Sequence, residues 1–137
     1  MIVDASGLIM GRLAVFAAKN ALKGENVDII NCENAIVTGN KRDVIEKYKH
    51  QRGRGGPFHG PFIGRQSSRL LKHVIKGMLP NRQARGREVL ARIKCHLGIP
   101  KELEGKKYET VKGASSEKLE TTKYLTLKEL SYELGAR

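Results

Sequence analysis

Lysine and arginine side chains are concentrated in one stretch of the chain, residues 41–94. This stretch carries 15 Lys and Arg residues against three Asp and Glu residues, which matches the formal charge of +12 of the whole protein. Guanidinium groups bind phosphate oxygens through paired hydrogen bonds. Crowded like charges weaken a fold unless an anion balances them. The pattern therefore favours a polyanion as the partner, and nucleic acid above all.

Three segments of this stretch are suited to phosphate. Residues 52–66 form a glycine-rich, basic loop, in which glycines let backbone N–H groups approach a phosphate closely. The apolar period predicts a helix over 67–79, capped by Ser67 or Ser68, with a basic face opposite the apolar one. A further helix is predicted over 86–92, where free N–H groups also favour phosphate. The candidate binding residues are Lys41, Arg42, Lys49, His50, Arg52, Arg54, Arg65, Arg69, Lys72, Lys76, Arg82, Arg85 and Arg87.

The basic charge allows other interpretations. A solvated basic face that keeps the protein soluble is one, and a free-standing DNA-compacting protein is another. An anionic membrane surface is disfavoured because the basic helix lacks large anchors such as Trp. No apolar run approaches the length of a membrane span, and the N-terminus does not resemble a signal peptide. We therefore expect a soluble, intracellular protein.

Two aromatic residues, Phe58 and Phe62, lie in the glycine-rich loop. They are able to stack on unpaired bases. The alternative is that both rings pack into the core of the domain, with the arginines solvating the loop. Since aromatic side chains usually bury, we expect the core position for the rings.

An enzyme is the second hypothesis. Asp4, Asn31 and Glu33 follow predicted strands, and open α/β sheets bind ligands at the carboxyl ends of their strands. These residues would define a crevice acting on a nucleotide or a nucleic acid, but no histidine near them completes an acid–base pair. Cys32 and Cys95, far apart in the sequence, are expected to be buried small side chains within strands.

The length of 137 residues indicates one domain. A strand over 2–5, a helix over 11–23 and a strand over 27–32 form a unit typical of a parallel sheet. A helix starting after the N-cap Asn40 and a late strand over 93–97 extend this α/β pattern. Residues 101–123 are predicted to be a polar arm. Thr126 and Glu129 predict a capping box at the start of the last helix.

Four stretches together resemble the archaeal and eukaryotic form of the large-subunit ribosomal protein 13 family. They are IVDASGLIMGRLA at 2–14, VDIINCENAIVTGN at 27–40, GPF in the glycine-rich loop, and KGMLPNRQARGREVLARIKCHLGIPKE at 76–102. The last is the most specific, and the similarity covers nearly the whole chain. The chain resembles the archaeal members more closely, because it lacks the long C-terminal extension of the eukaryotic ones.

The resemblance implies a single α/β domain over 1–137, with a small, mostly parallel sheet and helices on both faces. It implies a structural protein of the large ribosomal subunit, in the cytoplasm, that binds the large rRNA and supports assembly. Neighbouring ribosomal proteins are implied as partners, while no catalysis, cofactor, metal, membrane or small-molecule substrate is implied. The family's basic positions fall on Arg12, Lys41, Arg42, Lys76, Arg82, Arg85 and Arg87.

Overall fold

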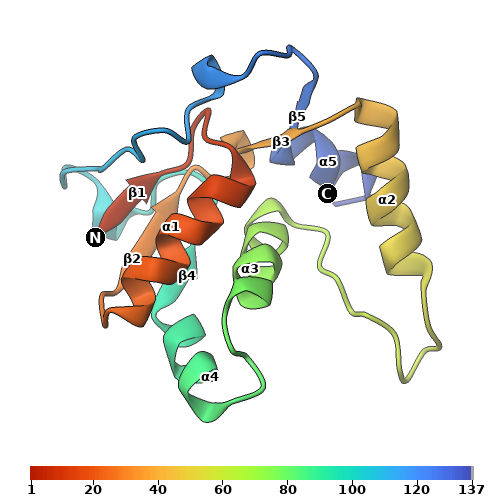
Figure 1. The fold of residues 1–137 in the computed structure, drawn as a ribbon, viewed down its shortest axis with the longest axis horizontal. Helices are drawn as coiled ribbons and strands as arrows, with labels where there is room; N and C mark the ends of the chain where they lie inside the picture. Colours follow the sequence, from red (N-terminus) through yellow and green to blue (C-terminus); the bar gives the residue numbers. More distant parts are fainter. Residues whose placement is uncertain (137) are drawn as a thin grey trace.

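The computed structural model describes residues 1–136 and shows an α/β domain with a three-stranded parallel sheet (Figure 1). Strands β1 (Ile2–Asp4), β2 (Val27–Ile30) and β4 (Ile93–Cys95) lie in the order β1-β2-β4. Helix α1 (Met10–Leu22) connects the first two strands. The predicted strand–helix–strand unit and the small, mostly parallel sheet are thus confirmed.

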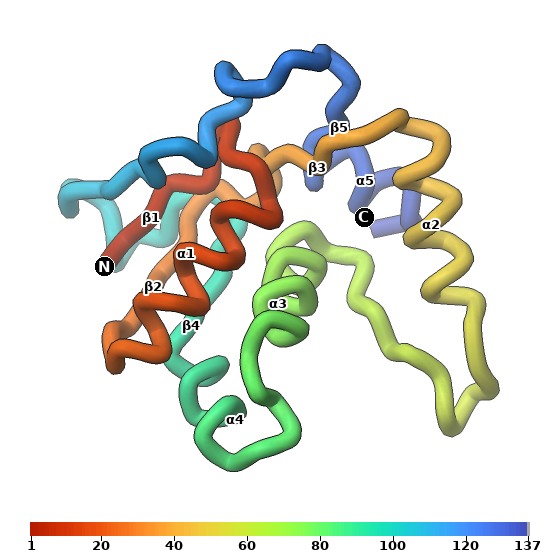
Figure 2. Tube along the Cα trace, viewed as in Figure 1, coloured from red at the N-terminus to blue at the C-terminus, as the bar shows by residue number. Residues whose placement is uncertain are grey.

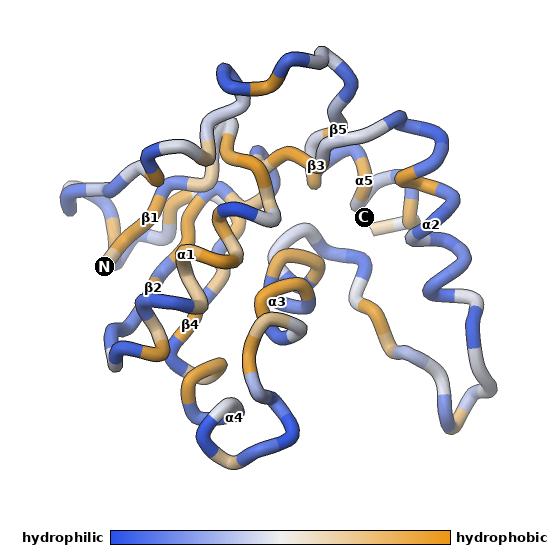
Figure 3. The backbone as a smooth tube through the Cα atoms, viewed as in Figure 1, coloured by the Kyte–Doolittle hydropathy of each residue, from blue (hydrophilic) through white to orange (hydrophobic). Residues whose placement is uncertain are grey.

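The sheet and the helices share one apolar core. Val3, Val27, Ile29 and Ile93 on the three strands are fully buried. Small side chains such as Ala17 on α1 belong to the same cluster and let the helix approach its neighbours closely. Figure 3 shows apolar residues gathered on the strands, α1 and α3, while α2 is mostly hydrophilic. No helix among residues 1–136 is long and apolar enough to cross a membrane.

Three further helices follow in the middle of the chain. They are α2 (Lys41–Gly53), α3 (Ser67–Met78) and α4 (Ala84–Ala91). Helix α3 contacts α1 and β4, while α4 contacts α1 and leads directly into β4. Because α2 continues to Gly53, the irregular loop is shorter than its composition suggests and runs over 54–66.

A second, two-stranded sheet lies beside the first. β3 (Ile36–Thr38) pairs antiparallel with β5 (Tyr124–Thr126), which runs straight into α5 (Leu127–Glu133). The antiparallel pair joins segments that are nearly ninety residues apart in the sequence. It therefore brings the end of the chain against α2 and α3 (Figure 1).

The predicted helix caps have different outcomes. Thr126 Oγ1 accepts the backbone N–H of Glu129 at 3.2 Å, as predicted, but the Glu129 carboxylate lies 3.7 Å from Lys41 Nζ. Asn40 stands at the N-cap of α2 without a side-chain cap bond. The prediction that Ser67 or Ser68 caps α3 is wrong, because Gln66 is the N-cap and the buried Ser67 hydroxyl donates to the Leu127 carbonyl at 3.1 Å.

The polar segment 101–123 is attached to the edge of the parallel sheet. The backbone N–H of Glu109 donates to the Ile2 carbonyl at 2.8 Å, and the Asp4 N–H donates to the Glu109 carbonyl at 3.2 Å. Two short 3-10 turns, η2 (Lys101–Leu103) and η3 (Ser116–Lys118), lie on either side of this contact. In Figure 2 this segment passes along β1 and over the top of the molecule to β5.

Candidate nucleic-acid interface

Helix α3 separates its apolar and basic side chains, as its sequence period predicts. Leu70, Leu71 and Ile75 are buried in the core. Cations at spacings of three and four residues must then lie on the opposite side, since that spacing follows the helical turn. The residues on this outer side are Arg69, Lys72, His73 and Lys76.

A close backbone contact fixes the turn after α3. A Cβ atom on Gly86 would overlap the carbonyl group of Pro80 and lie 2.9 Å from the amide nitrogen of Asn81. Only glycine permits this approach of α4 to the turn. The contact sets Arg82 beside the end of α3, and Arg85 is exposed on the first turn of α4.

Hydrogen bonds to the last helix anchor both ends of the basic loop. Arg52 Nη1 donates to the Leu134 carbonyl at 3.0 Å, and Arg65 Nη1 donates to the Gly135 carbonyl at 3.3 Å. These carbonyls lie at the C-terminal end of α5, where carbonyl groups lack helical partners and cations are favoured. Two of the arginines that were predicted to bind RNA therefore also hold the loop in place.

The loop itself crosses over at two glycines. A Cβ on Gly55, whose φ is +85°, would lie 2.6 Å from Gly60 Cα, and the His59 N–H donates to the Gly56 carbonyl at 3.2 Å. This closed turn holds the chain outside the core. Phe58 is 88% and Phe62 is 79% exposed, so the expectation that both rings bury is wrong.

Three adjoining hollows form what we call the cationic groove. The first, of about 550 Å³, lies under the loop; the second, of about 310 Å³, lies on α3; the third, of about 560 Å³, lies at the turn after α3. Phe62, Gly64 and Arg69 line both the first and the second, while His73 and Lys76 line both the second and the third. No carboxylate lines any of them. The cations of the groove are Arg52, Arg54, Arg69, Lys72, Lys76 and Arg82.

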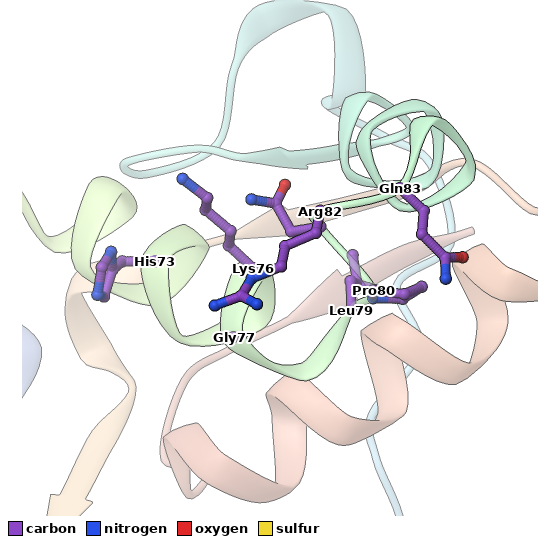
Figure 4. A pocket seen from close by; sticks show the side chains of 8 residues that line it. His73, Lys76, Gly77, Leu79, Pro80, Arg82 and Gln83 are labelled. Atoms are coloured by element: carbon purple, nitrogen blue, oxygen red, sulfur yellow. The ribbon is translucent and has the colours of Figure 1, made fainter.

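Most of the groove's cations have no partner within the part of the chain that the structure describes. Apart from Arg52, none of their side chains makes a hydrogen bond or ion pair there. Figure 4 shows Lys76 and Arg82 projecting into the same hollow from α3 and from the following turn. Two cations that line one hollow without a carboxylate favour a bound anionic group there.

The other predicted site residues lie around the groove or apart from it. Arg42, Lys49 and His50 are exposed on α2, and Arg87 is exposed on α4. Lys41 forms an ion pair with Glu129, and no other lysine or arginine among residues 1–136 forms one. The other residues outside the groove, Arg65 and Arg85, have been described above.

Arg12 is separate from this surface. It is exposed on α1, and its Nη1 donates to the Gly113 carbonyl at 2.7 Å, which links α1 to the polar arm. Sequence reasoning also omitted the uncharged Asn81 and Gln83, which line the third hollow beside Arg82. Their position in a Pro-Asn turn between two basic helices could have indicated in the sequence that they line the site.

The alternative crevice at the strand ends is occupied by structural hydrogen bonds. Asp4 Oδ1 accepts from the Ser6 N–H, the Ser6 hydroxyl and Asn31 Nδ2, at 3.0, 2.8 and 3.1 Å. Asp4 and Asn31 thus meet, as predicted. Glu33 instead turns to the backbone, and both of its oxygens accept the Gly98 N–H at 3.0 and 3.1 Å. The three residues fasten loops and do not pair a base with a nucleophile.

The two cysteines, distant in sequence, are neighbours in space. The Cys32 N–H donates to the His96 carbonyl at 3.2 Å, next to Cys95 at the end of β4. A hydrogen bond between the thiols raises the pKa of buried Cys32 and lowers that of half-buried Cys95. Cys32 opens the 3-10 turn η1 (Cys32–Asn34) and does not lie within a strand. No group of three metal-ligating side chains gathers anywhere in residues 1–136.

Comparison with known proteins relates the whole chain to one family. A family model of ribosomal protein L13 matches residues 1–102. The chain is 42% identical to large ribosomal subunit protein uL13 of Archaeoglobus fulgidus, an alignment that covers 99% of this chain and 88% of the relative. It is 40% and 41% identical to the uL13 proteins of Methanococcoides burtonii and Methanocaldococcus jannaschii, over 99% of this chain and 98% of each relative.

These relatives are archaeal, and their names describe a protein of the large ribosomal subunit. The archaeal type and the resemblance of the four sequence stretches agree with this family match. This chain therefore belongs to the ribosomal protein L13 family.

Proposed function

We propose that this protein binds large-subunit rRNA through the cationic groove and through the adjoining cations of α2 and α4. Its role is to neutralise phosphates and to fix RNA segments relative to one another while the subunit assembles. Side chains cannot enter the narrow major groove of A-form RNA, so base specificity in paired regions is slight. The chain contributes no catalysis and needs no cofactor for this role.

One observation carries the proposal. Arg54, Arg69, Lys72, Lys76 and Arg82 line three adjoining hollows without a carboxylate, and their side chains make no hydrogen bond or ion pair within residues 1–136. If each neutralises one phosphate, the groove alone contributes a log–log salt slope of about −3.5 to −4.5. Neighbouring ribosomal proteins are the further partners we propose.

Charge reversal at Arg82 in the groove and at the adjoining cations of α4 tests the proposal. We expect Arg82→Glu, Arg85→Glu and Arg87→Glu together to abolish rRNA binding and to leave the fold intact, because all three side chains are exposed. The matched control reverses Lys101, Lys106 and Lys107 on the polar arm, an equal change of charge outside the groove. Binding is measured by co-sedimentation with large ribosomal subunits.

Results of two kinds would contradict the proposal. In one, the groove variant binds as tightly as the wild type, or the arm variant loses binding equally. In the other, the wild type binds duplex DNA as tightly as structured rRNA, which would favour a DNA-compacting role.

A further inference from the structure

We propose that Phe62 stacks on one unpaired base of the bound RNA, so that the loop end of the cationic groove recognises a bulged or single-stranded nucleotide. The inference rests on the proposed RNA-binding function and adds to it the kind of RNA element bound at this end. Phosphate contacts alone position the RNA and do not read its bases.

The position of the Phe62 ring is the first argument. Phe62 lines both the hollow under the loop and the hollow on α3, and it is 79% exposed. Phe58 is 88% exposed but lines neither hollow. The two rings of the loop therefore differ in position, because only Phe62 forms part of the groove wall.

The loop backbone keeps this ring available. A Cβ on Gly55 would clash with Gly60 Cα at 2.6 Å, and a Cβ on Gly60 would lie 3.2 Å from the Gly56 carbonyl oxygen, a tight contact. The Ile63 N–H donates to the Pro61 carbonyl at 2.8 Å, directly beside Phe62. Arg65 fastens the loop to the end of α5. These contacts hold the Phe62 ring exposed at the wall of the groove.

The chemistry around the ring matches a nucleotide. Arg52, Arg54 and Arg69 line the hollow on one side of Phe62, and Lys72 and Lys76 line the hollow on the other side. An aromatic ring between cations is the arrangement that binds single-stranded nucleic acid, because the base stacks while the cations hold its phosphates.

The base must be unpaired for this contact. In an RNA duplex the faces of the bases are covered by their neighbours, so a protein ring reaches only unstacked bases in loops, bulges and ends. An apolar side chain of a neighbouring protein is the other occupant to consider. It would meet five cations and no carboxylate, which makes RNA the better match in charge.

The test measures binding of the full chain to three RNAs by fluorescence anisotropy. They are a fully paired duplex, the same duplex with a one-nucleotide bulge, and the bulged duplex with an abasic nucleotide at the bulge. We expect the wild type to prefer the bulged RNA over the other two by roughly 5- to 150-fold, the range of one base–aromatic stack. Phe62→Ala abolishes this preference, whereas Phe58→Ala, the matched control, retains it.

Two further variants distinguish stacking from apolar packing. Phe62→Trp retains the preference because it keeps an aromatic face, while Phe62→Leu loses it although it remains apolar. None of the phenylalanine variants changes the salt slope, because none removes a charge. A preference that survives in Phe62→Ala or Phe62→Leu, or that is lost equally in Phe58→Ala, would overturn the inference.

The outcomes also separate this inference from the function on which it rests. Equal wild-type binding to the paired and the bulged RNA, with a steep salt slope, would overturn the inference alone. Absence of salt-dependent binding to all three RNAs would overturn the proposed function and the inference together.

Discussion

Neutralising the basic face of α3 tests how much of the RNA affinity comes from the groove. Arg69, Lys72 and Lys76 line the middle hollow and have no carboxylate partner among residues 1–136. The variant Arg69→Gln/Lys72→Gln/Lys76→Gln keeps side chains of similar length and removes three charges. Since Leu70, Leu71 and Ile75 carry the burial of this helix, the fold should be unaffected.

The expected magnitude follows from counterion release. Each phosphate contact contributes about 0.7–0.9 to the log–log salt slope, so three lost contacts reduce the slope by about 2 to 3. At roughly 0.1 M salt the same loss lowers the affinity about 100- to 500-fold. The assay is rRNA binding measured at several salt concentrations.

The control for this experiment removes three charges elsewhere. Lys101→Gln/Lys106→Gln/Lys107→Gln changes the net charge equally but lies on the polar arm, outside the groove. We expect this variant to retain nearly the wild-type slope. An equal fall in the salt slope for both variants would refute the idea that RNA binds in the groove. It would indicate only a general attraction between the net charges of protein and RNA.

Three other predictions concern the fold. Gly86→Ala should lower the free energy of unfolding by about 1–3 kcal/mol, because its Cβ would clash with the backbone of Pro80. Gly11→Ala, which has open space around it, should be neutral or slightly stabilising. Urea denaturation measures the free energy of unfolding of both variants. Burial raises the pKa of Tyr48 above its usual 10.0, so the folded state holds this proton more tightly and stability falls as the pH rises past 10. Tyr48→Phe should therefore lose less stability between neutral and alkaline pH than the wild type in parallel melts. Iodoacetamide at neutral pH should modify Cys95 before Cys32, because the thiol–thiol hydrogen bond lowers the pKa of Cys95, which is also the more accessible of the two. Peptide mass spectrometry measures the order of modification, and modification of Cys32 first would contradict this prediction.

Local patterns in the sequence predicted much of the fold and part of the site. The apolar period of 67–79 gave the correct buried side of α3, and with it the line of cations that the groove contains. The apolar strands and the intervening helix predicted the parallel pairing of β1 with β2. These features depend on neighbours within a few turns, which is why the sequence alone is informative about them.

Long-range contacts account for what sequence reasoning missed. Arg52 reaches the carbonyl of Leu134, 82 positions away. Cys32 and Cys95 meet because β2 and β4 are adjacent strands. In each case a segment distant in the sequence supplies the contact, so the residue type alone did not predict it.

A density map of the native large ribosomal subunit that contains this chain is the most direct test of the cationic groove. We predict rRNA phosphate oxygens within about 3 Å of the nitrogen atoms of Arg69, Lys76 and Arg82, the distance of charge-assisted hydrogen bonds. A groove that faces solvent, or that is filled by carboxylates of a neighbouring protein, would contradict the account.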